Sequence, residues 1–225
     1  MTSILARAMG AGFRRLHPRL QAQYSVTSES GIAWVGRGVM SRIWSKGLLV
    51  APFLRLGAMR RVMFPETGTD VPFTIWNYAY KDAFGRETLT WIREFELSPV
   101  RRFDETLVFS ERRKRAVVYA GTHQHLAVEL HFEAGDNGSL RLQTGIQRLY
   151  EWRVGLRIPR LVSGHAHVVE RFNEVDDRFE IDVGIASPIV GPLFGYSGWF
   201  RLEPFACRRE DIPSDAMPVR EERRD

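Results

Sequence analysis

The chain has 225 residues, of which 44% are hydrophobic and 26% are charged, so it is long enough and apolar enough to bury one sizeable core. The single cysteine, Cys207, excludes an internal disulfide framework. The longest uncharged apolar run near the start, at 47–54, is far shorter than the ~20 residues of a membrane-spanning helix. These features predict a cytoplasmic globular protein.

The net charge of +5 is unevenly distributed along the chain. Residues 1–65 contain ten Lys or Arg and one acid, Glu29, which gives +9, so residues 66–225 sum to −4. The basic front of the chain favours an anionic partner such as a membrane surface, and a solvated helical face is the alternative. The slightly acidic remainder has no recurring basic and aromatic strand pattern, so nucleic-acid binding is not predicted.

Helical spacing dominates the first part of the chain. Residues 1–11 are expected to be a flexible lead-in. Phe13, Leu16 and Leu20 recur at helical spacing, which predicts a short amphipathic helix over 12–24. A second helix, interrupted near a proline, is expected over 41–63.

After a loop at 64–72 the apolar period changes to two, which is typical of strands. The candidate strands lie at 72–80, 86–97, 103–111, 115–121, 123–134, 139–152, 165–173, 178–186 and 193–203. With short turn sequences between them, they predict an α+β, mainly β fold: a curled antiparallel sheet or open barrel of about nine strands with two N-terminal helices. We expect a single β-rich domain over 12–205 and a charged, disordered tail over 206–225.

The stretch GTHQHLAVELHFEAG, at 121–135, raises the question of a metal site. On one straight strand, His123 and His125 share a face with Glu129, and the His-x-His spacing resembles the first metal motif of cupins. His165 and His167, on another predicted strand, are candidates for the remaining ligand. One ion can bridge two neighbours about 6.6 Å apart, but Glu129 lies about 13 Å from His125. A cupin-like, metal-dependent enzyme is therefore one alternative, and a solvated strand face is the other.

An arginine between two aromatic residues points to a different kind of site. Trp91, Arg93 and Phe95 share one face of their predicted strand, and an arginine in this setting can clamp a carboxylate or stack on a ring. Glu170 alternates with apolar residues on its own strand, so it needs a cationic partner, for which Arg93 is the candidate.

These residues predict a β domain that binds an apolar or acidic small molecule in a pocket closed by the two helices. The candidate ligand-binding residues are Trp76, Trp91, Arg93, Phe95, Glu170, Tyr196 and Trp199. Core packing explains the same aromatic residues without a ligand. A further alternative is peripheral attachment to the inner membrane face through 37–63, which carries six basic residues and no acid. The motifs identify no cofactor.

Several segments, read in order, resemble the bacterial domain-of-unknown-function family 4166. They are LHPRLQAQY, FPETGTDVPFTI, TWIREF, LVFSERR, IPRLV and HVVERFNEVDDRFEIDVGIASPIVGPLFGYSGWF, and they span about 15–203. The family often lies behind saccharopine-dehydrogenase-like or short-chain-dehydrogenase-like domains, so the resemblance implies a dehydrogenase-type partner. It implies no established activity, cofactor or catalytic residue.

Overall fold

The computed structural model describes residues 2–151, 154–161 and 163–224, without the side chains of 47–50 and 53. Residues 1, 152 and 225, at which predicted segments begin or end, lie outside the described residues. The strands are β1 (Ile32–Ser45), β2 (Gly68–Lys81), β3 (Glu87–Phe95), β4 (Arg101–Ser110), β5 (Arg115–Ala120), β6 (Leu126–Ala134), β7 (Leu140–Glu151), β8 (Val154–Arg157), β9 (His165–Asn173), β10 (Arg178–Ser187) and β11 (Gly191–Ala206). The helices are α1 (Ile4–Met9), α2 (Pro18–Tyr24) and α3 (Gly47–Met59), with 3₁₀ turns η1 (Gly10–Arg15), η2 (Arg209–Asp211) and η3 (Ser214–Ala216).

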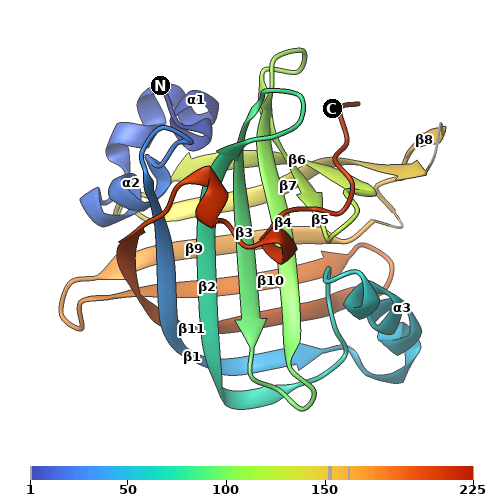
Figure 1. Ribbon diagram of the computed structural model, residues 1–225. Helices are drawn as coiled ribbons and strands as arrows, with labels where there is room; N and C mark the ends of the chain where they lie inside the picture. Colours follow the sequence, from blue (N-terminus) through green and yellow to red (C-terminus); the bar gives the residue numbers. More distant parts are fainter. Residues whose placement is uncertain (1, 152–153, 162, 225) are drawn as a thin grey trace.

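The strands form one antiparallel sheet that closes on itself (Figure 1). Its order in the described residues is β6-β5-β4-β3-β2-β1-β11-β10-β9-β7-β8, and β6 also pairs with β7, so ten strands close a barrel and β8 extends from β7. The mainly β prediction is confirmed. The strand count is higher than predicted because β1 and β8 join the sheet, and the barrel is closed where an open one was among the predictions.

Strand β1 occupies residues that were predicted to begin a helix. Its residues pair with β2 on one side and with β11 on the other, as far as Ile43 and Ser45 respectively. Because both edges of the segment are hydrogen-bonded to neighbouring strands, these tertiary contacts override the helical spacing of the apolar residues at 43–49. The helix therefore covers Gly47–Met59 and not 41–63.

The N-terminal helices cover one end of the barrel (Figure 1). The predicted helix over 12–24 is divided into η1 and α2, and α2 begins at Pro18, whose fixed φ suits the first helical position. Residues 1–11 were expected to be flexible, but α1 is capped by Ser3 and buries Ile4 and Leu5, the latter fully. Burial of this apolar stripe against the sheet explains why so short a helix forms.

The C-terminal tail is ordered along the outside of the barrel, where disorder was expected (Figure 1). Cys207, Ile212 and Ala216 are buried there in a cluster with Tyr78, Tyr80 and other outward-facing side chains of the sheet. Further along, the Val219 amide donates to the Thr122 carbonyl at 2.7 Å. These apolar anchors give the charged tail a fixed path.

The main core lies inside the barrel. Its largest fully buried side chains include an aromatic group made of Phe64, Phe73, Phe95, Phe194 and Phe200. No helix among the described residues has both the length and the apolar character needed to cross a lipid bilayer.

Candidate ligand-binding site

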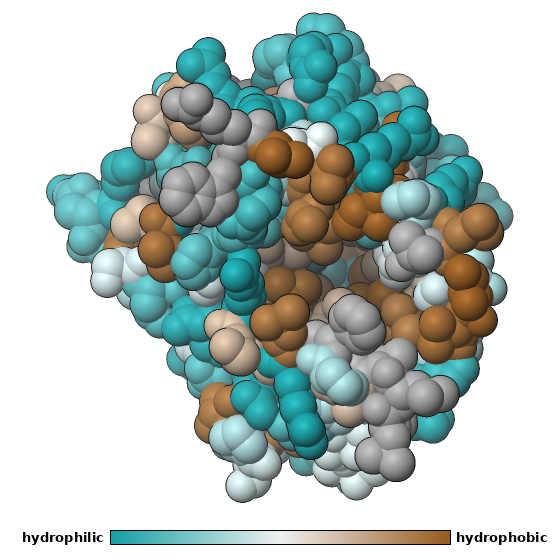
Figure 2. Space-filling model, turned by 90° about the vertical axis from the view of Figure 1, so that its right-hand side faces the viewer, coloured by the Kyte–Doolittle hydropathy of each residue, from teal (hydrophilic) through white to brown (hydrophobic). Residues whose placement is uncertain are grey.

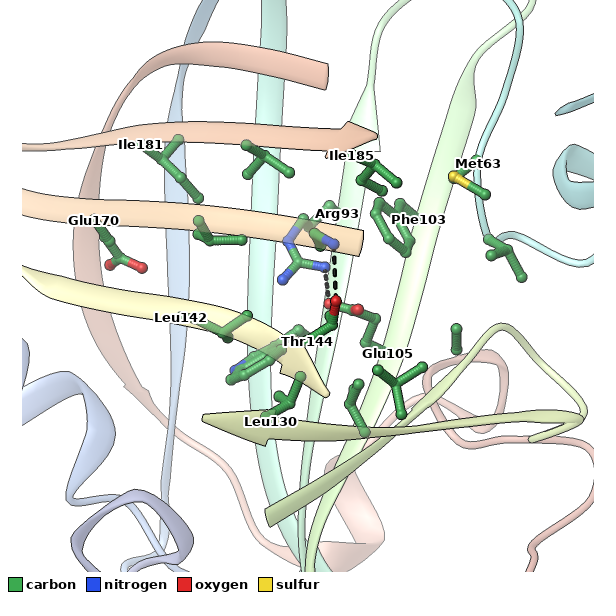
Figure 3. A pocket seen from close by; sticks show the side chains of 18 of the residues that line it. Met63, Arg93, Phe103, Glu105, Leu130, Leu142, Thr144, Glu170, Ile181 and Ile185 are labelled. Carbon is green, nitrogen blue, oxygen red and sulfur yellow. Dashed lines mark hydrogen bonds and ion pairs between the residues drawn. The ribbon is translucent and has the colours of Figure 1, made fainter. Parts of the chain in front are cut away.

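The barrel encloses a cavity of about 150 Å³. Inward-facing side chains from the strands line it, and Tyr24 and Gln23 of α2 reach it from the helical end. Figure 2 shows the hollow from the opposite end, where apolar residues surround its mouth. In Figure 3, Met63 lies at one end of the cavity and Glu170 at the other.

Alternation along the strands makes most of the wall apolar. On β6, Leu126, Val128 and Leu130 all line the cavity, as expected for residues two apart on one face. Leu142 of β7 and Val168 of β9 continue the same surface on the neighbouring strands. Polar groups interrupt this wall at only a few points, so each of them has a large electrostatic effect.

The first polar group is an ion pair between neighbouring strands. Arg93 Nη1 of β3 donates to Glu105 Oε2 of β4 at 2.7 Å. The guanidinium also lies 5.4 Å from the ring of Trp91 and 5.2 Å from that of Phe103. Burial by itself lowers the pKa of Arg93, but Tyr196 and Glu105 outweigh burial and raise it above the usual value. Arg93 is therefore a fixed cation whose Nε has no hydrogen-bond partner among the described residues.

The second polar group lies deeper, beside α2. The Tyr24 hydroxyl donates to Glu170 Oε2 at 2.6 Å, and both side chains are buried. Burial raises the pKa of Glu170, although hydrogen bonds from Tyr24 and Gln23 and the charge of Arg93 oppose this. Burial and the charge of Glu170 also raise the pKa of Tyr24 well above its usual value, so its hydroxyl stays a donor. Within the described part of the chain, Glu170 Oε1 and the neighbouring Gln23 Oε1 have no hydrogen-bond partner.

The structure brings four of the seven candidate ligand-binding residues together. Trp91, Arg93, Glu170 and Tyr196 line the cavity, and burial raises the pKa of Tyr196 to about 12. Phe95 also points inward, but it packs in the aromatic core against rings such as that of Phe64, 5.1 Å away. It therefore fills the barrel beside the cavity.

Trp76 and Trp199 lie on the outside of the barrel. Trp76 packs against the outer cluster beside the tail. Trp199 lies under two arginines, with the guanidinium carbon of Arg178 at 5.2 Å and that of Arg201 at 5.7 Å from its ring. Trp199 is three residues from the inward-facing Tyr196, and an odd spacing places two residues of a regular strand on opposite faces.

Five polar residues that line the cavity were not predicted, and two of them, Thr144 and Gln147, lie on β7. Glu105 alternates with Phe103 and so could have been assigned to the inner face from the sequence. Tyr24 and Gln23 come from a helix whose position depends on tertiary packing, and no local signal places them near β9. The expected pairing of Glu170 with Arg93 is wrong, because Arg93 bonds Glu105 and Glu170 accepts from Tyr24.

The histidines do not converge on one point. The expected straight strand over 123–134 begins only at Leu126, because the chain turns at Gln124, which has a φ of 52°. His123 bonds the Thr122 hydroxyl at 2.8 Å. His125 contacts Glu151 at 2.6 Å, near the barrel mouth.

The second histidine pair lies on β9. His165 Nε2 is 3.2 Å from the Arg160 carbonyl oxygen, whereas His167 is exposed. In residues 2–151, 154–161 and 163–224, no three His, Cys, Asp or Glu side chains are grouped to hold a metal ion. The cupin-like arrangement therefore has no geometric counterpart in these ranges.

Fold and site together define a closed antiparallel β-barrel with an internal, mostly apolar cavity. The sequence model of the family described as "Domain of unknown function (DUF4166)" matches residues 16–200, and the chain belongs to this family. It is similar to a protein named "Uncharacterized protein YndH" of Bacillus subtilis (strain 168), with 32% identity over 204 residues that cover 90% of this chain and 98% of the relative. No solved structure matches the chain.

Proposed function

We propose that the protein binds a small, largely apolar molecule with one polar group inside the barrel. The main support is the combination of an apolar cavity with buried polar atoms that lack partners among the described residues: Arg93 Nε, Glu170 Oε1 and Gln23 Oε1. A buried polar atom without a partner costs about 1–3 kcal/mol. A ligand that supplies the missing hydrogen bonds would recover this free energy on binding.

The charges favour a neutral polar group on the ligand. Arg93 is already balanced by Glu105, and burial disfavours ionisation of Glu170. A ligand carboxylate would add a further charge to a poorly hydrated space, at a high desolvation cost. A hydroxyl or a primary amide can accept from Arg93 Nε or donate to Glu170 Oε1 without that cost. The sequence predicted an apolar or an acidic ligand. The charges in the cavity favour the apolar one, with a neutral head group such as a hydroxyl.

The size of the cavity limits how much of the ligand it holds. A cavity of about 150 Å³ in another protein holds benzene. This barrel, with a cavity of about the same volume, would enclose one ring or a short chain. The rest of a longer molecule would extend through the mouth. A dehydrogenase-type partner stays a prediction from the family resemblance.

Titration with three fluorescent naphthalene derivatives, whose second ring would extend toward the mouth, tests the proposal. We expect 2-naphthol to bind more tightly than naphthalene, because its hydroxyl satisfies buried polar atoms, and more tightly than 2-naphthoate, which brings a charge. Ala166 lines the cavity and Ala186 is exposed on the neighbouring strand β10. Ala166→Trp should weaken 2-naphthol binding about tenfold or more, equivalent to about 1.4 kcal/mol. Ala186→Trp is the matched control and should bind like the wild type.

Two results would contradict the proposal. The first is no saturable binding of any of the three probes to the wild type. The second is equal weakening by both tryptophan variants, which would place the probe outside the barrel. If 2-naphthoate binds more tightly than 2-naphthol, the cavity is still the binding site, but the preferred head group is charged and not neutral.

A further inference from the structure

Large apolar side chains are exposed around the mouth of the barrel. Leu56 and Met59 of α3 have exposed fractions of 57% and 80%. Leu156 of β8, Leu161 and Ile189 are exposed by 60%, 65% and 66%. We call these five residues the apolar rim. A cluster of exposed apolar side chains at one place marks an interaction surface, whereas single ones are normal.

Hydrogen bonds place the rim segments around the same opening. The Lys46 amide, next to α3, donates to the Leu193 carbonyl of β11 at 2.8 Å. The Ile158 amide, after β8, donates to the Gln147 carbonyl at 3.0 Å. Gln147 and Gly164 line the cavity, as does Met63 after α3. Figure 1 shows α3 and β8 at the same end of the barrel, and Figure 2 shows apolar residues around the hollow.

The same segments are basic. Exposed cations near the rim are Lys46, Arg55, Arg60, Arg157 and Arg160. In the sequence, 37–63, 152–169 and 183–202 contain no Asp or Glu. Of the acids near this end, Glu66 accepts from Arg101 at 2.7 Å and Glu151 contacts His125 at 2.6 Å. The rim therefore combines apolar side chains with a local excess of positive charge.

The far end of the barrel carries charges of both signs, because Arg19 and the α2 N-cap His17 pair there with Asp177 and Glu174 at 3.3 Å and 3.0 Å. The β9–β10 turn exposes Val175 by 94% and places it among Glu174, Asp176 and Asp177. Figure 1 shows this turn on the side away from α3 and β8. The two ends therefore differ in how the cations are placed: those at the mouth lie beside the apolar rim, whereas those at α2 at the far end are paired with acids of the turn.

We propose that the rim docks on an anionic lipid bilayer with the mouth facing the lipid. Apolar side chains beside basic ones suit the bilayer interface, where they enter the head-group region and the cations contact anionic lipids. A second copy of the chain is the less suitable partner, because two basic rims would repel each other. Docking does not require a bound ligand, but it would let an apolar ligand pass between bilayer and cavity without crossing water.

Vesicle flotation tests this inference with phosphatidylcholine vesicles and with vesicles that also contain phosphatidylglycerol. We expect the wild type to float with the anionic vesicles at low salt and less at high salt, because the screening length falls from about 10 Å at 0.1 M to about 3 Å at 1 M. It should stay at the bottom with phosphatidylcholine alone. Each exposed Arg near an anionic membrane surface strengthens partitioning onto the vesicles. The double variant Arg157→Gln, Arg160→Gln should therefore partition about 30-fold more weakly than the wild type.

Leu56→Gln combined with Met59→Gln tests the apolar part and should also reduce flotation. Arg14→Gln with Arg15→Gln is the charge-matched control, since both arginines are exposed on η1. Val175→Gln is the apolar control at the far end. Both controls should float like the wild type, and circular dichroism should show that all variants are folded.

Three outcomes would overturn the inference. They are absence of wild-type flotation on anionic vesicles at low salt, an equal loss in the η1 control, and a dimer in solution that the Leu56 and Met59 changes convert to monomer without any effect on flotation. Failure of flotation with intact 2-naphthol binding would reject the docking alone. Flotation without probe binding would reject the proposed function alone.

Discussion

At the scale of single residues, Glu170 shows how burial sets chemistry. Glu170 is two residues from Val168 and from Phe172 on β9, so all three side chains lie on the same apolar face. This spacing places the carboxyl group inside the barrel. Tyr24 supplies one hydrogen bond, and burial raises the pKa of the carboxyl group. The result is an acid that is harder to ionise than an exposed one and can offer a proton or a lone pair to a neutral ligand.

The raised pKa of Glu170 makes a prediction about stability. A group whose pKa is raised in the folded protein contributes stability at low pH that is lost as the pH rises through the folded-state pKa. Glu170→Gln removes this titration while keeping an acceptor for Tyr24. We therefore expect the variant to gain stability relative to the wild type as the pH rises, by about 1.4 kcal/mol for each unit by which the pKa is raised.

Urea denaturation over a range of pH measures this difference. Glu203→Gln, at an exposed position on β11, is the control and should track the wild type at every pH. The prediction is contradicted if the free energy of unfolding of the wild type rises relative to that of Glu170→Gln as the pH rises. That result would show that the carboxylate is stabilised inside the barrel.

Alternation explains which site residues the sequence could identify. Trp91 and Arg93, two apart on β3, both face the cavity, and Tyr196 on β11 does too. The same alternation could have excluded Trp199 from the cavity lining. It also places Trp76 on the opposite face of β2 from Ile75, which lines the cavity. Pairing between strands is different, because the choice of Glu105 over Glu170 for Arg93 depends on which strand lies next to β3.

At the scale of elements, the tail shows how a few apolar residues order a charged segment. Its composition predicts disorder, yet Ile212 and Ala216 occupy an outward-facing apolar cluster beside Tyr78 and Tyr80. Strand alternation explains why this cluster lies on the outer face of β2. It does not predict that the C-terminal tail covers the cluster. Sequence patterns assign a strand to a face, whereas the segment that covers the face depends on the path of the chain.

Ile212→Ala should therefore lower the free energy of unfolding by about 2 kcal/mol or more, the cost of removing a buried isoleucine side chain. Val219→Ala, in the same tail but 76% exposed, is the matched control and should change it by less than about 0.5 kcal/mol. Thermal unfolding of both variants compares them. Equal stabilities would show that the tail does not pack on the barrel in solution.

Elements were predictable where local signals and tertiary contacts agree. The meander from β2 to β7 follows the predicted order because each strand pairs with the next. β1 was assigned in part to a helix, because its pairing partner β11 lies at the far end of the chain. Contacts between residues so distant in sequence leave no periodic signal.

At the scale of the whole molecule, the closed sheet encloses a cavity whose mouth opens at the apolar rim. Helices α1 and α2 cover one end, and the opposite end opens between basic, apolar segments. Pairing of β6 with β7 closes the barrel wall, and the mouth is the route to the interior. An enclosed site that opens at the mouth suits binding of a molecule that water solvates poorly.

The central claim is that this cavity holds a small molecule, and mass spectrometry of the intact protein tests it most directly. Under non-denaturing conditions, freshly purified wild type should carry an added small mass that is lost on denaturation, and extraction should yield a neutral, mostly apolar compound. Ala166→Trp, with the cavity filled, should lack the added mass, while Ala186→Trp should retain it. An unmodified wild-type mass, or the same adduct on both variants, would contradict the account.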